Sequence, residues 1–186
     1  MAQATGDREE YPWYKVVEGG GLLQGDFLDR CPVLVPRDPL LLTQKGANQT
    51  IDATVLVYDV VVMSQSCDLE QGKLDLVLVC PLWSLEEFGK ANSYFKSTDG
   101  KEQLRRGNIP GYHLVAPCEI QDWKREIRVV DFRTVFALPF EFLKKFVAET
   151  PKRLRLLPPY REHLSQAFAR FFMRVGLPAE IPPFKK

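Results

Sequence analysis

The densest polar cluster beside an apolar run is Ser64-Gln65-Ser66-Cys67-Asp68, which directly follows a valine-rich segment. Strand ends that feed a loop are common positions for functional groups, and a deprotonated cysteine is a nucleophile. The two histidines, His113 and His163, are the available bases, but no sequence spacing ties either one to Cys67. The interpretation that we favour is a polar turn whose side chains bond free backbone groups.

Other groups capable of acid–base or metal chemistry follow no recognised pattern. The carboxylates nearest the cluster match neither a calcium loop nor a two-metal site, and we expect them to be solvated turn residues; they are Asp26, Asp29, Asp68, Glu70 and Asp75. His113 is interpreted as a partly buried, hydrogen-bonded histidine, with a general base as the alternative. The sequence therefore predicts no metal ion and no cofactor.

The cysteines are also interpreted as structural. Cys31, Cys67, Cys80 and Cys118 stand 36, 13 and 38 residues apart, so no CxxC pair exists. Four cysteines without a signal peptide are typical of reduced thiols in the cytoplasm. Cys80 and Cys118 each sit beside a proline at the end of an apolar segment, which predicts that both are buried.

Basic residues form the strongest candidate binding surface. One group lies within a short interval and consists of Lys144, Lys145, Lys152, Arg153 and Arg155. A second group follows at helical steps of three, four and four and consists of His163, Gln166, Arg170 and Arg174. Positive charge along one helix face attracts phosphates or an acidic protein surface and is suited to bind them. The alternative is a solvated face that balances acidic residues within the fold. Arg105 and Arg106, in a predicted loop, would extend the patch.

The distribution of charge along the chain agrees with a basic binding surface in the C-terminal part of the sequence. The chain has a formal net charge of +1, but residues 1–123 carry 11 basic and 18 acidic side chains, whereas residues 124–186 carry 14 and 6. The two parts therefore have net charges of −7 and +8. At 45% hydrophobic and 26% charged residues, the composition is that of an ordinary globular domain and excludes a disordered, collagen-like or coiled-coil chain.

Strands that position these groups are predicted mainly in the first 137 residues. Aromatic and β-branched runs favour strands over 13–17, 31–35, 51–63, 74–80, 113–116 and 127–135. A helix is predicted over 82–94, capped by Ser84 and ended by Ser97-Thr98-Asp99-Gly100. Residues 1–10 are expected to be a flexible tail and residues 37–50 a long loop.

From Pro139 the apolar period becomes helical. A first helix is indicated by apolar residues at helical spacing, namely Phe142, Leu143, Phe146 and Val147. The clearest helix is predicted over 160–175, and its apolar stripe consists of Leu164, Phe168, Phe171, Phe172 and Val175. Core packing is the expected role of that stripe, with a partner surface as the alternative. Strands first and helices last predict an α+β fold, in which a small antiparallel sheet curls into a partial barrel over 11–137 and residues 138–186 form a helical extension.

The order of elements resembles that of the MazF/PemK-like growth-arrest toxins. The resemblance rests on Gln24-Gly25-Asp26-Phe27, on Val60-Val61-Val62-Met63-Ser64, on Leu76-Val77-Leu78-Val79-Cys80-Pro81, and on residues 127–135 followed by 138–147. It implies an SH3-like barrel and RNA cleavage. The chain departs from the family where the catalytic Arg-Pro is expected, because Tyr58-Asp59 stands there, and Trp83 separates Ser84 from the place of the family's Ser/Thr.

Three function classes follow. The first hypothesis is a non-catalytic protein-interaction or regulatory module of a prokaryotic stress or defence system, partnered by another protein of the same locus. The second is a MazF-type endoribonuclease, whose candidate catalytic residues are Ser64, Ser66, Cys67, Arg105 and Arg106, with Arg37 as a further arginine. The third is a nucleic-acid-binding protein that uses the basic helices. No apolar run is long enough to cross a bilayer, so we expect a cytoplasmic protein without membrane contact. The sequence does not predict the oligomeric state.

Overall fold

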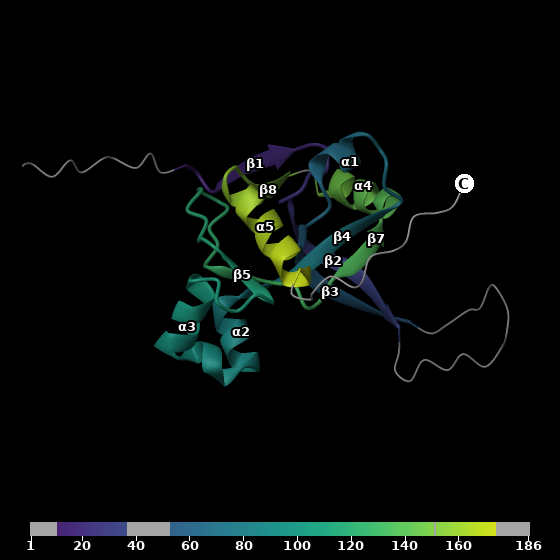
Figure 1. The fold of residues 1–186 in the computed structure, drawn as a ribbon. Coiled ribbons are helices and arrows are strands. Elements are labelled where there is room, and N and C mark those ends of the chain that lie inside the picture. The colour runs from purple at the N-terminus through teal and green to yellow at the C-terminus, as the bar shows by residue number, and fades with distance from the viewer. Residues whose placement is uncertain (1–10, 37–52, 151, 174–186) are drawn as a thin grey trace, which may run out of the picture.

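The computed structural model describes residues 11–36, 53–150 and 152–173 (Figure 1). In chain order the elements are β1 (Tyr14–Glu18), β2 (Phe27–Pro36), β3 (Ala53–Val62), α1 (Ser66–Glu70), β4 (Leu76–Ser84), α2 (Leu85–Ala91), the 3-10 helix η1 (Ser93–Lys96), α3 (Thr98–Arg105), β5 (Tyr112–Val115), β6 (Arg128–Asp131), β7 (Phe136–Pro139), α4 (Phe140–Glu149), β8 (Lys152–Leu156) and α5 (Tyr160–Phe172).

A six-stranded antiparallel sheet is built around β4. Its order is β2-β3-β4-β6-β5, and β7 also pairs with β4. Val79 of β4 pairs with Val62 of β3 and with Phe136 of β7, so these two strands flank it on opposite edges. The buried Val-rich segments of β3 and β4 form the middle of the sheet because branched side chains pack well on a pleated surface.

A second sheet has two strands, β1 near the start of the described chain and β8, which directly precedes α5 in the sequence order of elements. β1 pairs with β8 in an antiparallel register from Tyr14↔Leu156 to Glu18↔Lys152. The six-stranded sheet is not closed. The predicted α+β class is therefore confirmed.

Three apolar clusters hold helices on this framework. One includes Leu164 of α5 with Val61 of β3 and with Phe132, which directly follows β6, and a second includes Leu143 and Val147 of α4. The third joins Phe88 of α2, Phe95 of η1 and Leu104 of α3 to Val129 of β6. In Figure 1, α5 lies across the sheet and α2 and α3 form a separate helical projection beside β5.

The structure corrects the helix predicted over 82–94. Residues 82–84 belong to β4, and the helix occupies only Leu85–Ala91, although Ser84 caps it as predicted: its hydroxyl accepts from the Glu87 N–H at 3.0 Å. The predicted terminator Ser97-Thr98-Asp99-Gly100 instead begins α3, because the Ser97 side chain accepts from the Gly100 N–H. Serine favours both turns and N-caps, so the residue types alone do not decide between the two.

Two further differences concern strands. The strand predicted over 127–135 stops at Asp131, whose carboxylate bonds the Arg133 N–H and the Thr134 hydroxyl in a turn that leads to β7. Residues 152–156 form β8, a strand that the sequence did not predict. The tail at 1–10 and the loop at 37–50 lie outside the described residues. Among those that the structure describes, no helix is long and apolar enough to cross a membrane.

Candidate functional site

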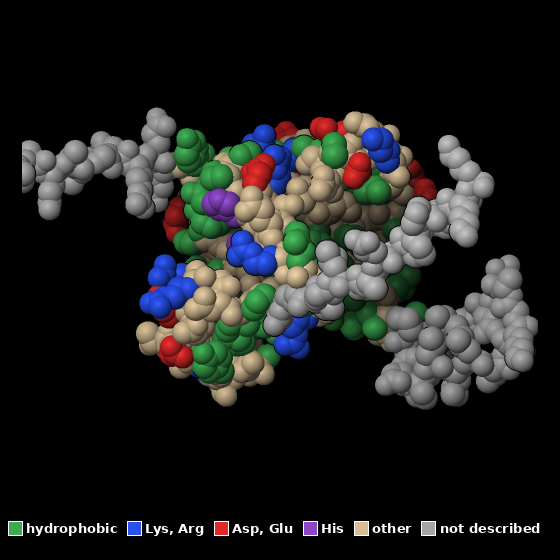
Figure 2. Space-filling model, viewed as in Figure 1, with side chains coloured by type: hydrophobic (Ala, Val, Ile, Leu, Met, Phe, Trp, Pro, Cys, Tyr) green, Lys and Arg blue, Asp and Glu red, His purple; other side chains and the backbone are tan. Residues whose placement is uncertain are grey.

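A pocket of about 280 Å³ opens between the end of α3, the edge strand β5 and one face of α5. We call it the α3–α5 pocket. Its polar lining consists of Arg105, Arg106, His113, His163, Gln166 and Arg170. Figure 2 shows Lys and Arg side chains over both helices with a histidine nearby. Five of these six residues were predicted as candidate catalytic or binding residues, and His113 as a candidate base.

Helix α3 supplies two of the arginines. Arg105 is its last residue and Arg106 its C-cap, and Gly107 follows with φ +68°, a left-handed conformation that ends a helix. Both arginines bond the Glu102 carboxylate, Arg105 through Nε at 2.7 Å and Nη2 at 2.6 Å and Arg106 through Nε at 2.7 Å. Hydrogen bonds from Arg105 and then Arg106 lower the pKa of Glu102 to about 2. One carboxylate between two guanidinium groups leaves a net positive charge at this wall of the pocket.

Helix α5 supplies the facing wall. His163, Gln166 and Arg170 are spaced by three and four residues, which places them on one side of a helix. The opposite side carries Leu164, which is fully buried, and Phe168, which packs on the same cluster. The helical phase predicted from the sequence is thus confirmed, and Arg170 makes no ion pair with any described residue.

The strand between the two helices contributes His113. Alternation along β5 sends Tyr112 and Leu114 to the cluster beneath α2 and α3, and His113 to the side of Phe132, whose ring centroid lies 6.2 Å away. Burial, with a smaller contribution from the charge of His163, lowers the pKa of His113 to about 4. Its imidazole is therefore neutral at neutral pH, and the expected partial burial is confirmed.

The arrangement has the chemistry of an anion site. Three arginine residues line one pocket, and none of the described residues that line it is acidic. Guanidinium groups present planar sets of donors that match phosphate or carboxylate oxygens. Sequence spacing could not reveal the convergence, because α3, β5 and α5 are brought together only by the packing of their apolar sides.

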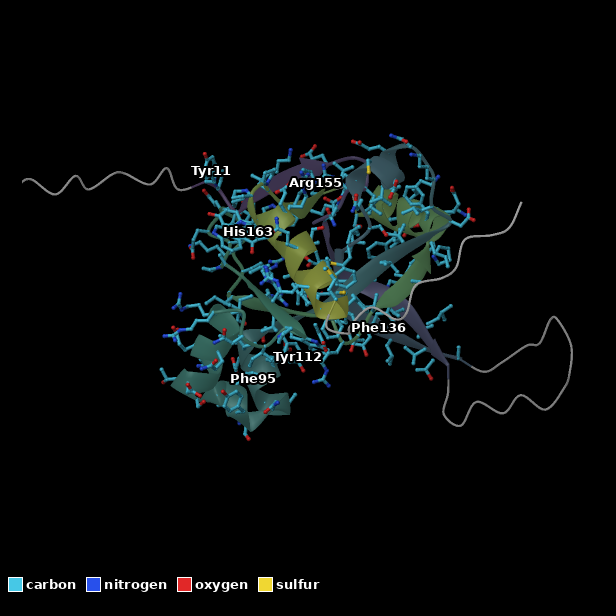
Figure 3. All side chains as sticks on the ribbon, viewed as in Figure 1. Tyr11, Phe95, Tyr112, Phe136, Arg155 and His163 are labelled. Atoms are coloured by element: carbon cyan, nitrogen blue, oxygen red, sulfur yellow. The ribbon has the colours of Figure 1, made fainter. Side chains whose placement is uncertain are left out.

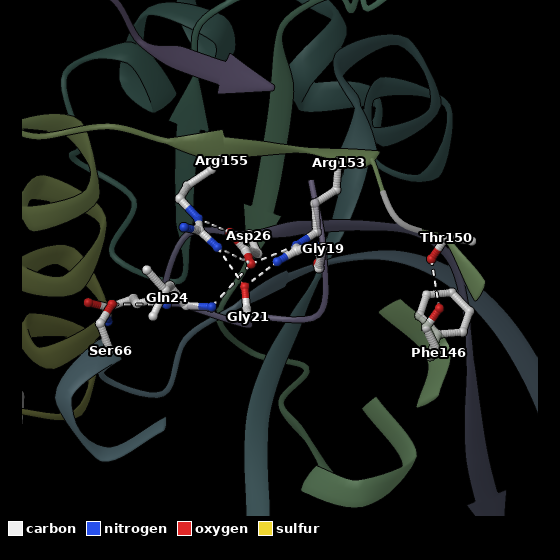
Figure 4. Close-up of polar contacts among 10 residues, drawn as sticks. Gly19, Gly21, Gln24, Asp26, Ser66, Phe146, Thr150, Arg153 and Arg155 are labelled. Atoms are coloured by element: carbon white, nitrogen blue, oxygen red, sulfur yellow. Dashed lines mark hydrogen bonds and ion pairs between the residues drawn. The ribbon is translucent and has the colours of Figure 1, made fainter. Parts of the chain in front are cut away.

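Arg153 and Arg155 belong to a different environment from the predicted basic surface. Asp26 was expected to be a solvated turn residue, but it is fully buried, because its carboxylate accepts hydrogen bonds from both arginines. Arg153 Nε lies 2.7 Å and Arg155 Nη2 2.8 Å from its Oδ2 (Figure 4). Arg153 also donates to the carbonyls of Gly19 and Gly21. These arginines tie β8 to the start of β2, and Arg153, which is 4% exposed, is not available to a ligand.

The remaining basic candidates are dispersed. On α4, Lys144 pairs with Glu141 and lies over the ring of Phe140, and Lys145 is exposed. Lys152 of β8 pairs with Glu18 at 3.0 Å. None of the three lines the α3–α5 pocket. Arg174 and Arg37 lie outside the described residues.

The turn expected over Ser64–Asp68 is corrected by the structure, because Ser66, Cys67 and Asp68 form the start of helix α1. The expected bonds from its side chains to free backbone groups are present. The Ser64 hydroxyl accepts from the Leu78 N–H at 2.9 Å and the Ser66 hydroxyl from the Gln24 N–H at 3.2 Å. Cys67 is exposed, and its thiol is 3.8 Å from Oε1 of Gln65. None of Ser64, Ser66 and Cys67 lines the pocket that contains Arg105 and Arg106.

The other cysteines and the carboxylates have structural positions. Cys31, Cys80 and Cys118 are buried free thiols, which confirms the prediction for Cys80 and Cys118, and burial raises the pKa of Cys80 to about 12. Asp29 pairs with Arg125 at 2.7 Å. Within the described ranges no group of three or more His, Cys, Asp or Glu side chains is arranged to hold a metal ion.

Comparison of the chain with protein-family models, with curated proteins and with solved structures finds no match. The resemblance to MazF/PemK-like toxins therefore stays a prediction.

Proposed function

We propose that the protein binds single-stranded nucleic acid, and that the α3–α5 pocket holds its phosphates. The observation that carries this proposal is the convergence of Arg105, Arg106 and Arg170, from two helices far apart in the sequence, on one pocket without an acidic lining residue among those described. Binding of phosphates by arginine releases condensed counterions, which is the main source of affinity in sequence-independent nucleic-acid binding.

The size of the pocket favours a single strand. Its volume of about 280 Å³ suits a phosphate with its sugar, and lies below the usual range for pockets that enclose larger small molecules. The neutral imidazole of His113 adds a hydrogen-bonding group without charge, so the attraction at neutral pH comes from the three arginines, whose charge is partly offset by Glu102.

The other two hypotheses stay predictions. An endoribonuclease would use His113 and His163 as the proton-transfer groups of this pocket rather than Ser64 or Ser66, which bond the backbone elsewhere. A protein-interaction module would use another surface, such as the exposed Leu34, Val55 and Val57 on the paired strands β2 and β3.

The test is fluorescence anisotropy with a labelled oligouridine heptamer, over a series of salt concentrations. We expect the dissociation constant of the wild-type protein to rise steeply with salt, because each phosphate contact on a single strand contributes about 0.7 to the log–log slope. The double variant Arg106→Ala/Arg170→Ala should bind at least about tenfold more weakly, with a slope reduced by about one.

The matched control is Lys144→Ala/Lys145→Ala, which removes the same charge from α4, outside the pocket. The proposal is wrong if the lysine variant weakens binding as much as the arginine variant, or if wild-type binding does not depend on salt. A denaturing gel of the same mixtures reads out cleavage: shortened RNA would support the endoribonuclease hypothesis.

A further inference from the structure

A second cavity, of about 420 Å³, adjoins the α3–α5 pocket on the other side of Tyr112, whose side chain lines both. We call it the α2 cavity. Trp83, Phe88 and Tyr112 supply aromatic lining, and Glu87, Asn92, Asp131 and Arg133 supply polar groups. No function discussed so far uses it.

The aromatic side chains of the α2 cavity are fixed in place. Tyr112 lies edge-to-face against Phe88 at 4.7 Å and against Phe95 at 5.8 Å, and both Tyr112 and Phe95 are labelled in Figure 3. Arg133 bonds the Tyr112 hydroxyl at 2.6 Å and covers its ring at 5.4 Å. Trp83 is partly exposed to the cavity and lies edge-to-face against Tyr58 at 5.7 Å. Rigid aromatic rings and a planar guanidinium are the surfaces on which unpaired bases stack.

The polar groups of the α2 cavity favour a base whose hydrogen-bonding edge carries two donors and one acceptor. Glu87 uses one carboxylate oxygen to accept from the Ser84 N–H, which leaves the other for a ligand. Asn92 accepts from the Tyr94 N–H through Oδ1, and its amide nitrogen makes no hydrogen bond with a described residue. The remaining carboxylate oxygen has lone pairs for the adjacent N1–H and N2–H groups of guanine, and an amide N–H donates to its O6.

We infer that the α2 cavity binds an unpaired guanine base of the strand whose phosphates occupy the α3–α5 pocket. The inference rests on the proposed function, because the shared residue Tyr112 places base and phosphate sites next to each other. Trp83 stacks on the base, Glu87 accepts from its Watson–Crick edge, and Asn92 donates to it.

The experiment compares two labelled RNA heptamers, one of uridine throughout and one with a single central guanosine. We expect the guanosine to tighten binding to wild-type protein about tenfold, because a bidentate hydrogen-bonded contact to one base edge discriminates between bases by about this factor. Glu87→Gln, which retains a side chain able to complete the capping box, should lose most of this preference while binding oligouridine normally. Replacing guanosine by inosine, which lacks the 2-amino group, should have the same effect on wild-type protein.

A second variant separates stacking from folding. Trp83→Ala should abolish the preference for guanosine and Trp83→Phe should keep part of it, and circular dichroism checks that each variant is folded. The control is Glu86→Gln, which lies on α2 beside Glu87 but outside the cavity and should change neither binding nor preference. Equal binding of the two RNAs by wild-type protein overturns the guanine site and leaves the proposed function intact. Failure of both RNAs to bind overturns the proposed function and this inference with it.

Discussion

His113 shows how the surroundings of one residue set its chemistry. Its neighbours in the fold are the ring of Phe132 and the second histidine, His163, and partial burial is the main cause of its lowered pKa. A histidine in an unfolded chain titrates near 6.5, so folding holds this imidazole neutral over a range where it would otherwise be charged.

The pKa of His113 predicts a pH dependence of stability. Between pH 6.5 and about 4 the unfolded chain binds a proton that the folded chain does not, so the free energy of unfolding falls as the pH falls through this range. The full effect of this one group is about 3 kcal/mol. Urea denaturation across the range measures it: His113→Gln should lose this contribution, whereas His163→Gln should keep most of it. A wild-type pH dependence in His113→Gln would contradict the assignment.

At the same scale, the sequence identified most polar residues of the α3–α5 pocket but not their association. The helical spacing of His163, Gln166 and Arg170 was readable because a period of 3.6 residues is local. Arg105 and Arg106 were singled out only as a charged pair. Arg153 was misassigned to the surface, since arginine is rarely buried and only the partner Asp26 makes burial possible.

At the scale of elements, the packing of α3 on η1 positions the arginine wall of the pocket. Gly100 sits at the contact, and a Cβ atom there would overlap the carbonyl of Tyr94 and crowd the backbone of Phe95. Alanine normally stabilises a helix relative to glycine by about 1 kcal/mol, so this glycine is explained by close approach and not by helix propensity.

Gly100→Ala should therefore destabilise the protein, by about 1–3 kcal/mol, because overpacking outweighs the gain in propensity. It should also weaken oligouridine binding, because α3 must shift together with Arg105 and Arg106. Thermal unfolding and anisotropy measure the two effects. Gly20→Ala is the matched control, since a Cβ there meets no atom within 4 Å. A melting temperature of Gly100→Ala at or above that of wild type would show that the contact is not tight.

The elements themselves were unequally predictable. Valine-rich β3 and β4 were expected near their actual positions, because continuous β-branched runs have few alternatives. The short helix α3 was missed, because its sequence, Thr98–Arg105, is polar and begins with turn-forming residues. The strand β8 was missed because its Lys-Arg-Leu-Arg-Leu sequence is unusual for a strand, and its arginines are neutralised only by the fold.

At the scale of the whole molecule, ion pairs connect the acidic and basic parts of the chain. Four acidic side chains of residues 1–123 pair with basic side chains of residues 124–186: Glu18 with Lys152, Asp26 with Arg153 and Arg155, Asp29 with Arg125, and Asp59 with Arg128. The asymmetry of charge along the sequence is thus partly cancelled within the fold, as the alternative interpretation of the basic residues predicted.

The buried pair at Asp26 should be the most important of these for stability. Asp26→Ala would leave two guanidinium groups, one of them fully enclosed, without their carboxylate, and we expect a loss of about 3–5 kcal/mol. The exposed pair gives the control: Lys152→Ala should cost no more than about 1 kcal/mol. Guanidinium chloride unfolding of both variants decides the matter. Equal losses would mean that burial of the Asp26 cluster has no special weight.

The sequence by itself determined the α+β class, the approximate strands of the sheet, the two larger helices and the polar face of the last one, because these depend on local periodicity and side-chain shape. Only the tertiary structure decided which charges remain available for binding. Arg153 and Arg155 are neutralised by a buried carboxylate about 130 residues away. Arg105 and Arg106, which share the single carboxylate of Glu102, and Arg170, which makes no ion pair with a described residue, line one pocket. Coulomb interactions act through space and not along the chain, so the binding surface became visible only once the strands and helices were packed.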